Sequence, residues 1–234
     1  MFLKSLKFAV GLLLLPLCVA VTRTFLFLLI EIKPESVAVI SMPVWGFFAG
    51  FGLWVFLFTI MPHPVKTYVF GHEMTHALWG LLMGARVSDI NITEEGGSVR
   101  LSKTNFLIAL APYYFPFYSA LTLLIYAALY AFTDLHAYKP LWLGLLGLTW
   151  AFHITFTFRM MREHQSDLSS HGFLFSYAVI YLFNLLGICF WIVAVGSPDT
   201  RLFLCKLTNE MLDIIAFFTG TAERCAVFIK NFLQ

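Results

Sequence analysis

The chain has 234 residues, of which 60% are hydrophobic and only 12% are charged, and its mean hydropathy is +0.83. This composition lies outside that of soluble globular domains and predicts an integral membrane protein. The formal net charge of +2 is small and the basic residues are scattered, which argues against a nucleic-acid-binding surface. We therefore expect a multi-pass integral membrane protein whose partners include the lipid bilayer and no nucleic acid.

The N-terminal stretch "MFLKSLKFAVGLLLLPLCVAV" has two lysines, an apolar run and small residues, as a cleaved signal peptide has. Its apolar character resumes after Arg23 in "TFLFLLI", which makes the apolar segment longer than a signal core. We therefore expect an uncleaved first transmembrane span.

Six apolar segments of helical length follow one another along the chain. They lie at about 8–30, 37–60, 67–84, 104–132, 140–159 and 172–195. A helix needs about 20 apolar residues to cross the hydrocarbon core, so the sequence predicts an all-α polytopic membrane protein with about six transmembrane helices. Pro112 and Pro116 in "APYYFPF" are expected to kink or interrupt the fourth span.

The third segment contains "FGHEMTHALWG", residues 70–80. His72 and His76 are four residues apart, so on a helix they project from one face and can hold one metal ion. Glu73 stands beside them, and in HExxH metalloproteases this glutamate takes a proton from water that Zn²⁺ activates. Ionisable residues inside a span each cost at least about 2–3 kcal/mol, so this cluster needs a compensating partner. Metal coordination supplies one, and a hydrogen-bonded polar cluster between helices is the alternative.

A polar segment, residues 85–104, follows this helix. Ile90 and Ile92 alternate with polar neighbours, "EEGG" is typical of a turn, and Val99 and Leu101 alternate again. The pattern predicts a small β-hairpin over about 86–102. The edge of such a hairpin can bind an extended peptide as an added strand.

A catalytic zinc centre usually has three protein ligands and one open position, so the two histidines need a third ligand. The stretch "HITFTFRMMREHQSDLSSHG" offers His153, Glu163, His164, Asp167 and His171. Asp167 follows a polar break and begins the last span, where an ordinary helix N-cap would also be an aspartate. His153 lies within the fifth span, where an interhelical hydrogen bond would also explain it. We rank Asp167 first and His153 second.

The chain becomes mixed in character after Pro198. Apolar residues recur at helical spacing opposite Glu210 and Asp213. These apolar residues are Met211, Ile214, Ile215 and Phe218. The pattern predicts two parts, a helical transmembrane bundle over 1–198 and an amphipathic or interfacial helical tail over 199–234. Packing of the tail against the bundle or a partner would produce the same stripe.

The segment "GHEMTHALWGLLMGARVSDINITEEGGSVRLSKTNFLIALAP" resembles the site-2 protease family of intramembrane zinc metalloproteases, in its compact form without a PDZ domain. The resemblance covers about residues 67–117 and extends to 150–190. It implies a helix with the HExxH motif, a small β-hairpin that dips toward the membrane, and an aspartate on a later helix. In this chain, the resemblance implies that His72, His76 and Asp167 are the Zn²⁺ ligands. It also implies that Glu73 is the general base.

The motif and the resemblance lead us to expect a zinc-dependent endopeptidase that hydrolyses peptide bonds of membrane-spanning or membrane-associated protein substrates. The alternative is a catalytically inactive membrane scaffold or binding protein of the same fold. The intact Glu73 favours the enzyme, because a scaffold needs the metal ligands at most. A di-iron lipid desaturase needs clustered histidine boxes, whereas the seven histidines here are dispersed from His63 to His171.

Overall fold

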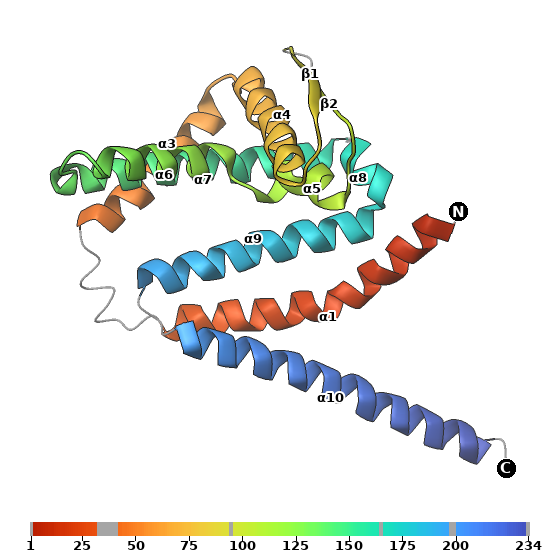
Figure 1. Cartoon of the computed structure of the whole chain (residues 1–234). Coiled ribbons are helices and arrows are strands. Elements are labelled where there is room, and N and C mark those ends of the chain that lie inside the picture. Colours follow the sequence, from red (N-terminus) through yellow and green to blue (C-terminus); the bar gives the residue numbers. More distant parts are fainter. Residues whose placement is uncertain (1, 32–41, 94–95, 164–165, 197–199, 233–234) are drawn as a thin grey trace. The chain divides into compact units, whose positions relative to one another are not determined.

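The structure is a computed structural model that describes residues 2–31, 42–93, 96–163, 166–196 and 200–232 (Figure 1). Helices dominate, and one antiparallel pair of strands follows the helix that carries the HExxH motif. The elements in chain order are α1 (Phe2–Glu31), α3 (Met42–Ile60), α4 (Val65–Leu82), β1 (Val87–Ile92), β2 (Gly97–Leu101), α5 (Phe106–Tyr114), α6 (Phe117–Tyr130), the 3₁₀ helix η1 (His136–Tyr138), α7 (Lys139–Arg162), α8 (Ser166–His171), α9 (Phe173–Gly196) and α10 (Thr200–Phe232).

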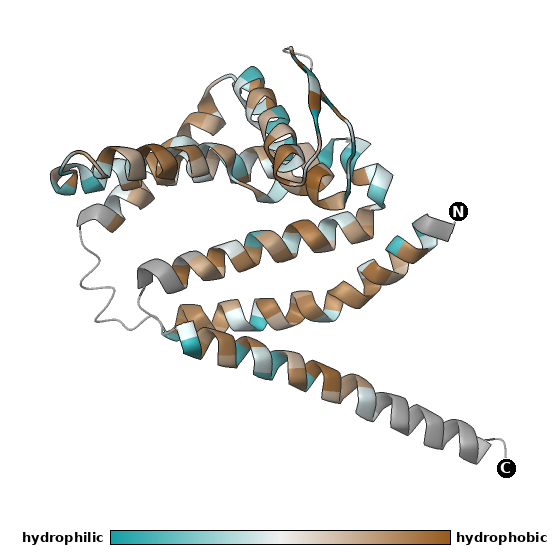
Figure 2. Ribbon diagram, viewed as in Figure 1, coloured by the Kyte–Doolittle hydropathy of each residue, from teal (hydrophilic) through white to brown (hydrophobic). Residues whose placement is uncertain are grey.

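Three of the described helical segments are long and apolar enough to cross a membrane, namely Lys4–Glu31, His136–Arg162 and Phe173–Phe190. The pair α5 and α6 passes the same test together and adds a fourth span if the bent pair counts as one. The brown stretches of these helices in Figure 2 show the apolar runs. These helices are compatible with a multi-pass membrane protein, but the predicted number of six spans is not confirmed. The apolar part of α3, Val44–Ile60, is shorter, and α4 contains the polar HExxH cluster.

The break between α5 and α6 lies at one of the two prolines in question. Pro112 is accommodated inside α5, whereas Pro116 precedes the first residue of α6, and the two helices are bent by 76° relative to each other. A proline at the start of a helix is tolerated because its missing N–H is not needed there. The expected interruption of the fourth span therefore occurs, at the second proline.

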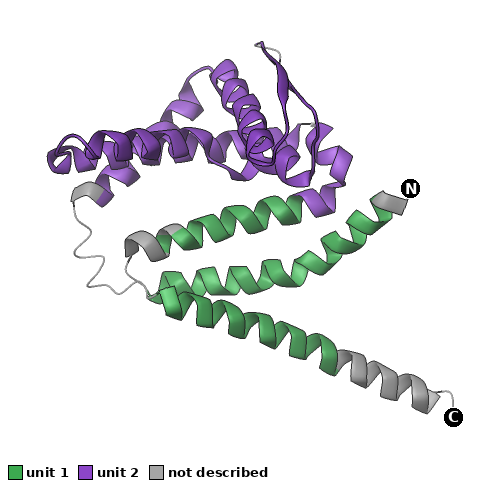
Figure 3. Cartoon of the chain, viewed as in Figure 1, with its two compact units in different colours: residues 1–37, 177–234 green, residues 38–176 purple. Residues whose placement is uncertain are grey.

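The described chain divides into two compact units (Figure 3). Unit 1 contains residues 1–37 and 177–234, and unit 2 contains residues 38–176. The tail predicted over 199–234 forms the helix α10, which groups with α1 and most of α9 in unit 1. Its interfacial position stays a prediction. The HExxH helix, the hairpin and α8 all belong to unit 2.

In unit 1, a small apolar cluster joins the helices. Val21 of α1 and Leu182 and Leu185 of α9 are buried, and Leu207 of α10 packs against them. Apolar contact of this kind removes side-chain surface from the surroundings and holds helices at a fixed separation. The cluster therefore anchors α10 to the other two helices.

Glu210 of α10 points toward α1 rather than away from it. Its side chain lies 2.8 Å from Nζ of Lys206 and 3.4 Å from Nη1 of Arg23, and the hydrogen bond from Lys206 is the first cause of its lowered pKa. Met211 and Phe218, from the apolar stripe, are 41% and 54% exposed. The helix thus packs through Leu207 and Glu210, whereas Asp213 and the apolar residues Met211 and Phe218 remain exposed.

In unit 2, α3 and α7 lie side by side and approach closely through glycines (Figure 1). A Cβ atom added at Gly50 would overlap the carbonyl oxygen of Gly144, and one added at Gly147 would overlap that of Phe47. Small residues at such a contact let two backbones meet, which is a common way of packing helices in membranes. Trp54 also donates a hydrogen bond of 2.9 Å from Nε1 to Oγ1 of Thr155.

Replacing Gly50 by leucine tests this contact. A side chain at position 50 would collide with the backbone carbonyl of Gly144, which cannot move aside as a side chain can. Overpacking costs about 1–3 kcal/mol of folding free energy even where the neighbouring side chains can move. We expect Gly50→Leu to lower the free energy of unfolding by at least about 2 kcal/mol. Gly52→Leu is the matched control, because nothing lies within 4 Å of a Cβ built at Gly52. Unfolding in sodium dodecyl sulfate followed by circular dichroism measures both, and equal midpoints would contradict the packing described here.

The predicted hairpin is confirmed. β1 and β2 pair antiparallel, with Ile90 opposite Val99 and Ile92 opposite Gly97, and an irregularity lies between Val87 and Asp89. The hairpin packs on α4, where Leu101 fills the space over Gly80 at 3.0 Å from its virtual Cβ. Part of the predicted "EEGG" turn, residues 94–95, lies outside the described residues. The two strands therefore pair in a defined register, and the hairpin packs against the helix that carries His72 and His76.

Candidate metal centre

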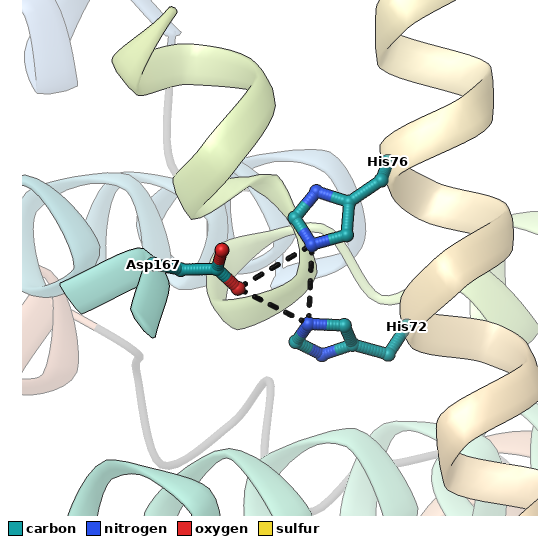
Figure 4. A group of neighbouring side chains, drawn as sticks. All are labelled: His72, His76 and Asp167. Carbon is teal, nitrogen blue, oxygen red and sulfur yellow. Dashed lines mark hydrogen bonds and ion pairs between the residues drawn. The ribbon is translucent and has the colours of Figure 1, made fainter. Parts of the chain in front are cut away.

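The two histidines of the motif meet one turn apart on α4, as the spacing predicts. The ring centroids of His72 and His76 are 4.8 Å apart, and their Nε2 atoms are 3.2 Å apart. Both rings leave the same side of the helix in Figure 4. The helix therefore presents two imidazole nitrogens to one point.

Asp167 comes from the short helix α8 and reaches the same point (Figure 4). Its Oδ2 atom lies 3.4 Å from Nε2 of His72 and 3.4 Å from Nε2 of His76. The side chain of Leu168 is fully buried, and Oγ of Ser176 donates a hydrogen bond of 3.1 Å to its carbonyl oxygen. These contacts fix α8 and so place the carboxylate.

The three atoms form a triangle with sides of 3.2, 3.4 and 3.4 Å. In a regular tetrahedron around Zn²⁺ with ligand distances of about 2.0–2.1 Å, neighbouring ligand atoms lie about 3.3–3.4 Å apart. The triangle therefore matches one face of such a tetrahedron. No other group of at least three histidine, cysteine, aspartate or glutamate side chains in the described ranges has donor atoms this close.

The outer nitrogens of both rings are held by further groups. Nδ1 of His76 lies 2.9 Å from the carbonyl oxygen of Ile108, which can only accept, so this nitrogen carries the proton. Nδ1 of His72 lies 2.9 Å from the hydroxyl of Tyr68. Such partners orient metal-binding histidines, and in His76 the proton on Nδ1 leaves the Nε2 lone pair of the neutral ring available to an ion.

Asp167 is ionised at physiological pH. Burial alone would raise the pKa of its carboxyl group, but the neighbouring His72 and His76 side chains, with Nε2 atoms 3.4 Å from Oδ2, hold it well below its usual range. Tyr113 of α5 adds a hydroxyl 3.4 Å from Oδ2 and sets its ring edge-on to His72, with centroids 5.4 Å apart. The site therefore offers a negative oxygen ligand in a mostly buried setting.

Glu73 lies about 100° around the helix from His72 and is only 6% exposed. Its side chain runs against strand β2, where a Cβ added at Gly97 would come within 2.5 Å of Cγ and 2.8 Å of Oε1 of Glu73. Only a glycine at position 97 leaves this space. The hairpin thus confines the candidate general base from the side opposite α4.

Gly97→Ala should therefore displace Glu73 without removing a metal ligand. A shift of about 1 Å in a catalytic group can cost about 100-fold in rate, so we expect a fall of that order in peptide cleavage with metal content unchanged. Ser98→Val, which adds bulk at the neighbouring exposed position of the same strand, is the control. Cleavage of a membrane-spanning reporter in proteoliposomes measures the effect, and equal rates for both variants would refute the steric role of Gly97.

The other sequence candidates for the third ligand do not join the group. His153 lies on α7, Glu163 follows that helix, and His171 ends α8 with Nδ1 2.8 Å from Oγ of Ser170. None of the three belongs to the triangle, and His164 lies outside the described residues. The structure therefore brings the first-ranked candidate, Asp167, to the histidines and leaves the second, His153, apart.

Sequence reasoning did not identify the supporting groups of the site. Tyr68 stands four residues before His72, so the helical repeat that identifies the two histidines also marks this tyrosine. Tyr113 and the carbonyl of Ile108 come from α5, which Asn105 starts by accepting a hydrogen bond of 3.0 Å from the Ile108 N–H. No local pattern indicates these two partners.

Comparisons of the chain with models of known protein families, with curated proteins and with solved structures find no match. The function therefore has to be inferred from the chemistry of this site.

Proposed function

We propose that the protein is an intramembrane zinc metalloendopeptidase of the site-2 protease type, which hydrolyses peptide bonds of membrane-spanning or membrane-associated proteins. The observation that carries the proposal is the triangle of His72, His76 and Asp167, with the sides expected of a tetrahedral zinc centre, beside Glu73. Three protein ligands leave one position for water or substrate, which is typical of catalytic rather than structural zinc.

A zinc ion at this site supplies Lewis-acid activation of water and of the scissile carbonyl. The protein's own residues do the rest. Glu73 accepts the proton of the attacking water on a carboxylate oxygen and donates it to the nitrogen of the leaving amine. Gly97 and its strand hold that carboxylate in a confined space, which limits the conformations from which it can transfer the proton.

Strand β2 is the proposed guide for the substrate. Peptide hydrolysis requires an extended backbone, and among the described residues β1 and β2 form a two-stranded sheet, so each has a free edge. β2 touches Glu73 through Gly97. An extended substrate added along the sheet would therefore pass close to the general base.

We also propose that all six predicted spans lie in the membrane. α3 and α4 join the three long apolar helices and the bent pair α5–α6, and the close glycine contact between α3 and α7 supports a membrane position for α3. The position of α4 would place the metal centre within the bilayer. We propose a bacterial inner (cell) membrane as the location.

Removal of the metal tests the proposed function. We expect the purified protein in proteoliposomes to cleave a membrane-spanning reporter, and 1,10-phenanthroline to abolish cleavage because it removes the Lewis acid. Added Zn²⁺ should restore the activity, and the non-chelating isomer 1,7-phenanthroline is the control. Full activity after verified removal of the metal would contradict a zinc-dependent mechanism.

A further inference from the structure

A cavity of about 520 Å³ in unit 2 lies at the ends of α3 and α7 that are near the start of α4. The apolar part of its lining comes from Phe58 of α3 and from Ile154 and Phe158 of α7. Phe158 is 64% exposed, so the apolar wall is open to the surroundings of the helix. In a membrane protein, such a wall faces acyl chains.

The polar part of the lining includes two arginines. Arg159 and Arg162 are three residues apart on α7, so they project from neighbouring positions on one face. Nε of Arg159 lies 3.5 Å from Oε1 of Glu163, whereas Arg162 forms no ion pair with any residue that the structure describes. His63 also lines the cavity, with its ring centroid 4.2 Å from that of Phe58. The polar part of the lining thus contains two guanidinium groups, one carboxylate and one imidazole.

The arginines stand at the end of a candidate membrane span. Arg162 is the last residue of the candidate span His136–Arg162, and Arg159 is one turn earlier. Long basic side chains at the end of a span reach the interface, where they attract anionic lipids. The carbonyl groups at the C-terminal end of α7 repel anions, so the side chains must supply the attraction. Arginine does this well, because its guanidinium can donate two parallel hydrogen bonds to a phosphate.

We propose that this cavity binds an anionic glycerophospholipid, with its phosphate at Arg159 and Arg162 and an acyl chain along Phe58, Ile154 and Phe158. The apolar wall favours a lipid over free phosphate, which gains nothing from contact with it. Substitution of Glu163 can tell the two lipid classes apart, because a carboxylate in the cavity repels an anionic headgroup but attracts the ammonium group of a zwitterionic headgroup.

Native mass spectrometry of the purified full chain in detergent tests the proposal. The probes are dioctanoyl phosphatidylglycerol, dioctanoyl phosphatidylcholine and glycerol 3-phosphate, each titrated separately. We expect phosphatidylglycerol to bind more tightly than the other two. We expect Arg162→Gln to weaken its binding about fivefold, the usual share of one basic residue at a membrane surface. Glu163→Gln should strengthen it, and Lys139→Gln, which removes one charge at the far end of the same helix, should leave it unchanged.

Four results would overturn the proposal. Equal binding of phosphatidylglycerol and phosphatidylcholine would exclude an anionic headgroup site. Equal binding of glycerol 3-phosphate would show a phosphate site without a lipid chain. Weaker binding by Glu163→Gln would indicate a zwitterionic ligand. Arg162→Gln and Lys139→Gln with the same effect would show that net charge, and not this cavity, decides the affinity. The gain of affinity expected for Glu163→Gln cannot arise from misfolding.

Discussion

Glu73→Gln should abolish peptide cleavage while the protein keeps its metal. Glutamine has the size of glutamate but cannot accept the proton of the attacking water, and general acid–base catalysis contributes about 10²–10⁴-fold to rate. We expect a loss in that range for a membrane-spanning reporter in proteoliposomes. The metal should stay, because its ligands are His72, His76 and Asp167, and the Glu73 side chain packs instead against Gly97.

The same variant separates an enzyme from a scaffold. A scaffold needs the fold and at most the metal, so its function would survive Glu73→Gln. Cleavage at the wild-type rate by Glu73→Gln would contradict the general-base role. Loss of both cleavage and zinc would show that Glu73 helps to hold the site together, and the two measurements are therefore made on the same preparation.

Asp167→Ala should cost more than about 100-fold in Zn²⁺ affinity, because even outer-shell partners of metal ligands contribute about 10–100-fold. The variant removes the negative oxygen that lies 3.4 Å from both histidine nitrogens. Cleavage at limiting zinc should be lost with it. His153→Ala is the matched control, because His153 lies on α7 and outside the ligand group.

Competition with a chromophoric zinc chelator measures both affinities in detergent. An unchanged affinity for Asp167→Ala would contradict its role as a ligand, and a large loss for His153→Ala would indicate that His153 is a ligand instead. Circular dichroism of both variants shows that the fold is retained, which is expected because Asp167 is partly exposed and its helix is anchored by Leu168.

Local patterns predicted the parts of the site that lie close together in sequence. The spacing of His72 and His76 fixes their relative position on any helix, and the alternation around Ile90 and Val99 fixes a hairpin. Asp167 is 95 residues from His72, so no local spacing could pair it with the histidines, and it was ranked from the chemistry of zinc, its place after a polar break and the family resemblance.

Packing between distant segments accounts for most of what the sequence did not reveal. Tyr113 supports the site from another helix, and Gly97 makes room for Glu73 from another strand. The contact of Gly50 with Gly144 does leave a signal, since glycines recur at close spacing on both α3 and α7. A periodic pattern of glycines indicates that a helix has a face suited to close packing, but it does not identify the helix that packs against it.

The helical tail also shows that a sequence pattern does not identify the packing partner of a helix. Its periodicity separates a charged side from an apolar side, and either could have faced the bundle. Contacts from other helices settle it, because Arg23 on α1 lies 3.4 Å from Glu210 and Leu207 packs against the apolar cluster, so this face of α10 turns inward while Asp213 stays exposed. The prediction of six spans is not confirmed either, because α4 carries the polar HExxH cluster and the apolar part of α3, Val44–Ile60, is short.

The metal content of the wild-type protein tests the central claim most directly. Inductively coupled plasma mass spectrometry on detergent-purified, monodisperse protein gives the amount of each metal per chain. The geometry of His72, His76 and Asp167 predicts about one zinc per chain, because three ligands at tetrahedral spacing hold one ion. Well-folded protein that contains no zinc, and takes up none when Zn²⁺ is added, would contradict the metal centre and reduce the three side chains to a polar packing cluster.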